Sequence, residues 1–146
     1  MTISIGSDHG GYQLKEQLIL ALKEKGYKVI DQGCLGPESV DYPYYARRVA
    51  RDVQSEISTK GILICTTGIG MSIVANKFRG IRAALIMNED AAKLSRQHND
   101  SNVICLGAKY TPFEIAIKYV LIFLEENFLG ERHSRRVNMI KEVEEK

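Results

Sequence analysis

The sequence has 146 residues, of which 45% are hydrophobic and 26% are charged. These values predict one globular domain over residues 1–146 and leave little room for a second one. The formal net charge of +2 gives no overall basic field of the kind that drives non-specific nucleic-acid binding, so any anion has to be recognised locally.

The amino terminus, the apolar runs and the cysteines favour a cytoplasmic protein without a membrane span. The first residues carry no basic stretch followed by an apolar region, and the longest unbroken apolar run, 119–124, is far below the roughly 20 residues that cross a bilayer. Cys34, Cys65 and Cys105 are odd in number and form no C-x-x-C pair. Reduced thiols are therefore expected, and no metal site.

Short β-rich runs alternate with amphipathic helical stretches, which is typical of a parallel sheet with helices on both faces. Strand 2–7 precedes helix 12–25, in which Leu14, Leu18 and Leu22 share one face, and Gly26 ends the helix. Further strands are predicted over 27–31, 61–65, 81–87 and 102–106. Further helices are predicted over 44–56, 70–77, 89–98, 112–127 and 132–145, with a loop over 33–43. The fold class is therefore α/β.

In an open α/β sheet, ligands bind at the carboxyl ends of the strands, near the point where the strand order reverses. Two segments with polar and glycine residues follow predicted strands, at 7–11 and at 65–70, and a third polar segment, 97–100, ends a predicted helix. Chemistry is expected in these three places.

Cys65 ends an apolar strand and begins a turn rich in threonine and glycine that leads into a helix. Free amides and the helix dipole favour negative charge at such a position, which suits a reactive thiolate. The hydroxyls of Thr66 and Thr67 add donors for an oxyanion. For an isolated cysteine, a buried residue beside an ordinary helix start would be the favoured interpretation, and that interpretation fits Cys34 and Cys105 better.

The other polar segments have simpler interpretations beside the functional one. Asp8 and His9 fit a capping pair at the surface as well as a ligand-binding pair, although the following glycines favour the latter. His98 fits a solvated histidine at a helix carboxyl end. Arg132 and Arg136 share one helical face and suit a phosphate, but by themselves they more often form a solvated face.

Taken together, five segments in the same order along the chain strongly resemble the B-type ribose-5-phosphate isomerases, whose broader family includes allose-6-phosphate and galactose-6-phosphate isomerases. The segments are Ser7-Asp8-His9-Gly10-Gly11, Asp41-Tyr42-Pro43, Cys65-Thr66-Thr67-Gly68-Ile69-Gly70, Ser95-Arg96-Gln97-His98-Asn99-Asp100 and Arg132-His133-Ser134-Arg135-Arg136.

The resemblance implies a Rossmann-like three-layer domain with a five-stranded parallel sheet. It implies an aldose–ketose isomerase of the pentose phosphate pathway that interconverts ribose 5-phosphate and ribulose 5-phosphate through an enediolate. It implies no metal and no organic cofactor. The expected partners are the sugar phosphate and a second copy of the chain, in a homodimer or a dimer of dimers, with neither nucleic acid nor membrane.

The resemblance also assigns roles to residues. Cys65 is the base that moves a proton between C1 and C2, His98 is the acid–base group that opens the sugar ring, and Thr67 stabilises the enediolate. The expected substrate contacts are Asp8, His9, Tyr42, Thr66, Gly68, Ile69, Gly70, Asn99, Lys109, Arg132 and Arg136. The implied division gives Asp8, His9, Cys65, Arg132 and Arg136 to one subunit and His98, Asn99 and Lys109 to its partner.

Two positions depart from the commonest family pattern, which has glycine at Thr66 and arginine at Lys109. Thr66 narrows the anion site, and Lys109 keeps the charge without a bidentate fork. Some relatives use serine in place of the cysteine and a glutamate base four residues later. That position is Ile69 here, which leaves Cys65 as the base.

Two other classes of protein compete with the isomerase. A cysteine phosphatase needs an arginine six residues after its nucleophile, where this chain has Met71. A flavodoxin-like or dinucleotide-binding module is suggested weakly by Gly68 and Gly70, but the full G-x-G-x-x-G pattern is absent. The sequence does not separate five-carbon from six-carbon sugar phosphates.

Overall fold

The computed structural model describes residues 1–145, which form a five-stranded sheet covered by helices on both faces. The strands are β1 (Thr2–Ser7), β2 (Lys28–Asp31), β3 (Lys60–Cys65), β4 (Ala83–Leu85) and β5 (Val103–Gly107). The helices are α1 (Tyr12–Glu24), α2 (Tyr42–Gln54), α3 (Ile69–Ala75), α4 (Glu89–Gln97), α5 (Phe113–Glu125) and α6 (Arg132–Val143), and a short 3-10 turn, His9–Gly11, precedes α1.

The strand order is β2-β1-β3-β5-β4, and every pairing is parallel. The predicted α/β class and five-stranded parallel sheet are therefore confirmed. From β1 the chain moves outward to β2 and then crosses to β3 on the other side, so the strand order reverses between β1 and β3. The carboxyl ends of these two strands form the crevice in which α/β proteins bind ligands.

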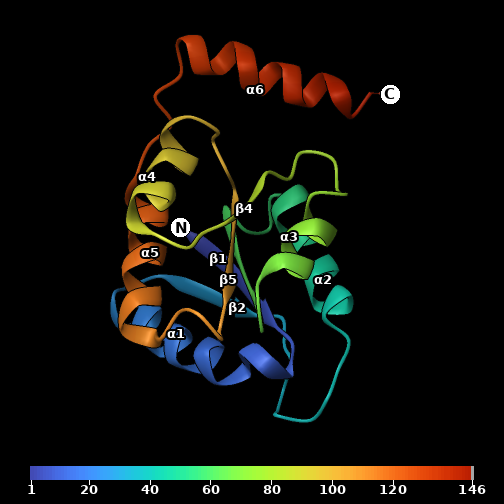
Figure 1. Cartoon of the computed structure of the whole chain (residues 1–146), viewed down its shortest axis with the longest axis vertical. Coiled ribbons are helices and arrows are strands. Elements are labelled where there is room, and N and C mark those ends of the chain that lie inside the picture. Colours follow the sequence, from blue (N-terminus) through green and yellow to red (C-terminus); the bar gives the residue numbers. More distant parts are fainter. Residues whose placement is uncertain (146) are drawn as a thin grey trace.

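Two cores lie on opposite faces of the sheet, because successive strand side chains point to opposite sides. On one face Ile62 and Ile64 pack with apolar residues of α1, α4 and α5. On the other face Leu63 and Cys65 pack with α2 and α3. Figure 1 shows these two helical layers on either side of the sheet.

Most element bounds differ from the predicted ones by one or two residues, and two differences have a clear cause. Helix α2 begins at Tyr42 rather than 44, because Pro43 is accommodated in a first helical turn, where its missing N–H costs nothing. The predicted strand 81–87 shortens to Ala83–Leu85. The strand begins only at Ala83, because the N–H of the preceding Arg82 donates to the side chain of Asn102 at 2.8 Å and not to a strand carbonyl.

Helix α6 stands apart from the two layers and lies across one end of the molecule beside the end of α4, whereas the loop before α2 lies at the other end (Figure 1). Within residues 1–145, no helix combines the length and the apolar character needed to cross a membrane.

Candidate active site

Cys65 is the last residue of β3, and its side chain is buried on the α2 and α3 face of the sheet. The N–H of Gly68 donates a hydrogen bond to Cys65 Sγ at 3.1 Å. Gly68 has a φ of +79°, and a Cβ there would press on Leu85 and on the Leu106 backbone. Only glycine fits this turn, and the turn places the Gly68 N–H against the thiol of Cys65.

The other cysteines are placed differently. Cys105 is completely buried in the middle of β5, where burial and the nearby Cys65 strongly raise the pKa of its thiol. Cys34 is also buried, and its thiol donates to the Gly36 carbonyl at 3.3 Å. Neither has a glycine-rich helix start beside it, which agrees with the structural role that the sequence predicts for both.

A cavity of about 420 Å³ opens over Cys65 at the carboxyl edge of the sheet. Seven residues predicted for the site line it, together with Ile73: they are Asp8, Tyr42, Cys65, Thr66, Thr67, Ile69 and Gly70. They come from the ends of β1 and β3 and from the first turns of α2 and α3. The structure therefore brings three of the predicted segments together around the thiol.

Two local features shape this cavity. Buried Asp8 caps the short turn after β1, since its carboxylate accepts from the Gly11 N–H at 3.2 Å. Gly70 lies directly against the ring of Tyr42, and a Cβ on Gly70 would collide with that ring. The Thr67 hydroxyl accepts from the Ile69 N–H at 3.3 Å, which leaves its own proton for a ligand.

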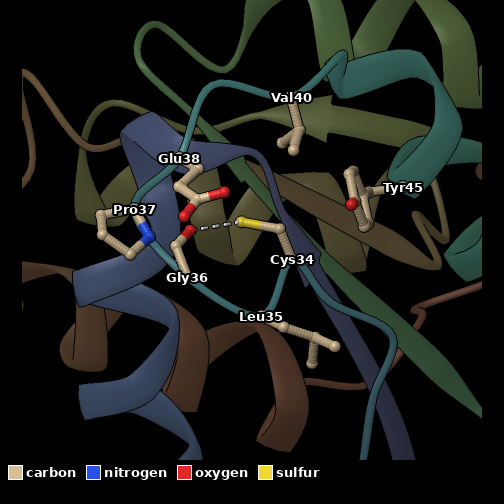
Figure 2. Close-up of a pocket in the computed structure, with 7 residues that line it drawn as sticks. All are labelled: Cys34, Leu35, Gly36, Pro37, Glu38, Val40 and Tyr45. Atoms are coloured by element: carbon tan, nitrogen blue, oxygen red, sulfur yellow. Dashed lines mark hydrogen bonds between the residues drawn. The ribbon is translucent and has the colours of Figure 1, made fainter.

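His9 is exposed beside this cavity and is held by the loop that precedes α2. Its Nδ1 accepts from the Val40 N–H at 3.1 Å, so the proton of the neutral ring is on Nε2, ready to donate. The same loop covers a second cavity of about 430 Å³, and Figure 2 shows Cys34 inside it with its thiol directed to Gly36. The loop before α2 therefore holds the Nδ1 side of His9 and leaves the Nε2–H for a ligand.

Lys109 also lies at this edge of the sheet. It follows β5 by two residues, and its N–H donates to the Thr66 carbonyl at 3.0 Å. Its side chain is exposed, with Nζ 5.8 Å from the ring centre of Tyr110. A cation thus stands next to the turn that carries Cys65.

His98 and Asn99 lie at the opposite, amino edge of the sheet. They follow α4, and Arg82, just before β4, donates through Nε to the carbonyls of Asn99 and Asp100 at 3.2 and 2.9 Å. Lys60, the first residue of β3, interacts electrostatically with Arg96 of α4 and with Asp100 of the turn that follows α4. Five residues of extended chain separate Lys60 from Cys65, which is about 16 Å. His98 therefore does not reach the Cys65 of its own chain.

Arg132 and Arg136 belong with His98. They are exposed on α6, and His133 between them stacks on His98 with ring centres 4.2 Å apart and planes 12° from parallel. The structure thus forms two groups, one at each edge of the sheet. The family resemblance implied a different grouping, with the two arginines beside Cys65 and with Lys109 beside His98. In this chain the arginines lie beside His98, and Lys109 lies beside the turn that carries Cys65.

Sequence reasoning missed two kinds of residue at these groups. Ile73 completes the lining of the Cys65 cavity. It lies four residues after Ile69 in a predicted helix, so the sequence already indicated that the two side chains share one helical face. Arg96 is buried and forms an ion pair with Asp100 at 2.8 Å, which fixes the turn that carries His98. Arg96 and Asp100 lie four residues apart in the segment 95–100, and this spacing of opposite charges could have predicted the pair.

The fold and the Cys65 cavity define a class of open α/β protein that binds a small anionic ligand at the switch point of a parallel sheet. A family model described as Ribose/Galactose Isomerase matches residues 3–140. The chain therefore belongs to the ribose/galactose isomerase family.

Individual relatives match over almost their whole length. Ribose-5-phosphate isomerase B of Escherichia coli K12 is 44% identical over 144 residues, covering 99% of this chain and 97% of the relative. The solved structure of Clostridium thermocellum ribose-5-phosphate isomerase B aligns with a TM-score of 0.98 at 48% identity, covering 99% of this chain and 98% of that one. The Thermotoga maritima ribose 5-phosphate isomerase aligns with a TM-score of 0.95 at 45% identity, covering 97% of each chain.

Proposed function

We propose that this chain is an aldose–ketose isomerase that interconverts ribose 5-phosphate and ribulose 5-phosphate, as a step of the pentose phosphate pathway in the cytoplasm. The observation that carries the proposal is the thiol of Cys65, which faces the Gly68 N–H at 3.1 Å in a cavity that also holds Asp8 and Thr67. Full-length relatives named ribose-5-phosphate isomerase B support the reaction and the substrate.

The chemistry needs one base beside two adjacent carbons and donors aimed at the developing enediolate. Cys65, as thiolate, takes the proton from C2 of the open-chain aldose, and the electron pair moves onto the C1 oxygen to form the enediolate. The proton of the C2 hydroxyl passes to the C1 oxygen, so the negative charge moves to the C2 oxygen. The thiol then returns its proton to C1 while the C2 oxygen becomes the carbonyl of the ketose, and the thiolate is regenerated. The hydroxyl of Thr67, which lines the cavity, and the Nε2–H of His9 are neutral donors that can serve the oxyanion.

The complete site requires a second subunit in this proposal. His98 lies at the amino edge of the sheet, and Cys65 ends β3 about 16 Å along the strand from Lys60 at that edge. A twofold dimer that sets the amino edge of one chain against the carboxyl edge of the other supplies both groups to each of two sites. One chain then contributes Asp8, His9, Tyr42, Cys65 and Lys109 with the 66–70 turn, and the partner contributes its copies of His98, Asn99, Arg132 and Arg136.

A coupled assay tests the reaction and the substrate together. We expect turnover of ribose 5-phosphate to exceed that of allose 6-phosphate and galactose 6-phosphate. In Cys65→Ala we expect kcat to fall by about 100-fold or more, because a positioned base contributes about 10²–10⁴ to the rate. Cys34→Ala is the matched control, since it removes another buried thiol outside the cavity. Equal activity of the two variants would remove Cys65 as the base.

A further inference from the structure

The turn between β1 and α1 carries Asp8 and His9, and both of its ends are fastened to β3. The Asp8 N–H donates to the Ile64 carbonyl at 3.2 Å. At the other end, a Cβ on Gly11 would lie 2.7 Å from that same carbonyl oxygen, so the Gly11 backbone packs directly on β3. The middle of the turn, His9 and Gly10, is held through side-chain contacts instead.

Gly10 is in contact with the side chain of Thr66, the first residue after β3. A Cβ on Gly10 would overlap the Thr66 hydroxyl oxygen, and it would lie 3.3 Å from Asp8 Oδ1 and 3.4 Å from the Thr66 backbone nitrogen. The backbone of Gly10 is not in the left-handed region, so the obstacle to an alanine here is the Thr66 side chain and not backbone strain. Positions 10 and 66 thus share one small space.

This shared space connects the turn of His9 with the turn of Cys65. Thr66 follows Cys65 and lines the same cavity, whereas Gly10 follows His9. On the other side of His9, the Val40 N–H donates to Nδ1 at 3.1 Å. His9 is therefore located by two contacts, one from the loop before α2 and one from the Thr66 side chain through Gly10.

We propose that Thr66 is a positioning residue, whose side chain packs on Gly10 and thereby sets the position of the His9 Nε2–H beside the Cys65 cavity. The inference rests on the proposed function, in which His9 is a donor to the oxyanion. The contact exists because position 66 carries a side chain, where the commonest family pattern has glycine. A misplacement of about 1 Å costs on the order of 100-fold in rate, so a change in this contact should appear in kcat.

Four proteins test the shared space: the wild type, Gly10→Ala, Thr66→Gly and the double variant, with kcat and KM measured for ribose 5-phosphate. We expect Gly10→Ala to lower kcat by about 100-fold, because its methyl group displaces the turn. Thr66→Gly should lower kcat by about tenfold, since the middle of the turn loses its packing. The double variant should be more active than either single variant, because the alanine methyl group then fills the space that Thr66 leaves.

Two further comparisons show whether the effect passes through His9. In a His9→Ala background, adding Gly10→Ala should lower kcat by less than about threefold, because the donor that the turn positions is already absent. Gly36→Ala is the matched control, since a Cβ on Gly36 meets nothing within 4 Å and the backbone there is not left-handed. It should keep the wild-type kcat.

A double variant no more active than Thr66→Gly overturns the positioning role, because the Thr66 hydroxyl would then act on the substrate directly. This comparison decides the matter even where Gly10→Ala alone does not fold. Equal losses from Gly10→Ala with and without His9 also overturn it, since the contact would then support only the fold. A wild-type protein inactive on every sugar phosphate overturns the proposed function instead, and urea unfolding of the four proteins then tests the contact between positions 10 and 66 by itself.

Discussion

A buried lysine beneath the substrate edge of the sheet shows how single residues hold the fold. The side chain of Lys15 is fully buried, and its Nζ donates to both oxygens of Asp31, at 2.9 and 3.0 Å, and to Glu16 at 2.7 Å. Burial lowers the pKa of Lys15, but the hydrogen bonds to Glu16 and Asp31 outweigh it, so the pKa is raised overall. Asp31 also accepts from the Gly33 N–H at 2.9 Å, at the start of the loop that reaches His9.

We expect Asp31→Ala to lower the free energy of unfolding by about 2–4 kcal/mol, because it leaves a buried ammonium with one partner. Glu16→Ala should cost less than about 1 kcal/mol, since Glu16 is 47% exposed and its pairing is screened by water. Urea unfolding of the two variants at pH 7 gives both values. Equal losses would mean that Asp31 contributes no more than a surface ion pair.

The residue scale also shows how much of the site the sequence could predict. Asp8, Cys65 and Thr67 were found from their position after predicted strands, and all three line one cavity. The contribution of Gly70 was not predictable in detail, because its close approach to Tyr42 joins residues 28 positions apart. This contact depends on how α2 packs against α3, and the residue pattern of either helix alone does not predict it.

At the scale of elements, the docking of α6 should depend on pH. The pKa of His133 is lowered in the folded protein, so the undocked helix binds a proton more readily than the docked one. The contribution of His133 to docking is therefore fully present above its ordinary pKa of about 6.5 and is lost as the pH falls below it.

We expect amide protection factors in α6 to fall between pH 7.5 and pH 5.5, while those of β1 and β3 stay unchanged. Hydrogen exchange measured by mass spectrometry tests this, and His133→Phe, which cannot titrate, is the control. Protection that falls equally in the wild type and in that variant would assign the pH dependence to other groups of the helix, such as Glu131 and Glu144.

At the scale of the whole molecule, the two separated groups of site residues make subunit exchange informative. Cys65→Ala and His98→Asn have lesions at opposite edges of the sheet, so a mixed dimer has one site with both lesions and one with neither. Random exchange makes about half of the dimers mixed, and the mixture should recover roughly a quarter of wild-type activity. Co-refolding the two variants and assaying ribose 5-phosphate turnover measures this recovery.

Lys109→Glu supplies the matched control for that experiment. Lys109 lies at the same edge as Cys65, so mixing Cys65→Ala with Lys109→Glu leaves a lesion in every site and should recover no activity beyond that of the parents. Recovery in this control, or none with His98→Asn despite verified exchange, would contradict the arrangement of two shared sites.

The sequence by itself determined the α/β class, the parallel sheet and the residues at the ends of β1 and β3. These depend on local patterns of apolar spacing and on glycines that only certain turns accept. Only the tertiary structure decided that His98, Arg132 and Arg136 lie together at the amino edge and that Lys109 lies beside Thr66. The reason is that α4 connects two parallel strands and therefore returns the chain from the carboxyl edge of the sheet to its amino edge before β5 begins. A short sequence motif does not show at which edge of the sheet its residues lie.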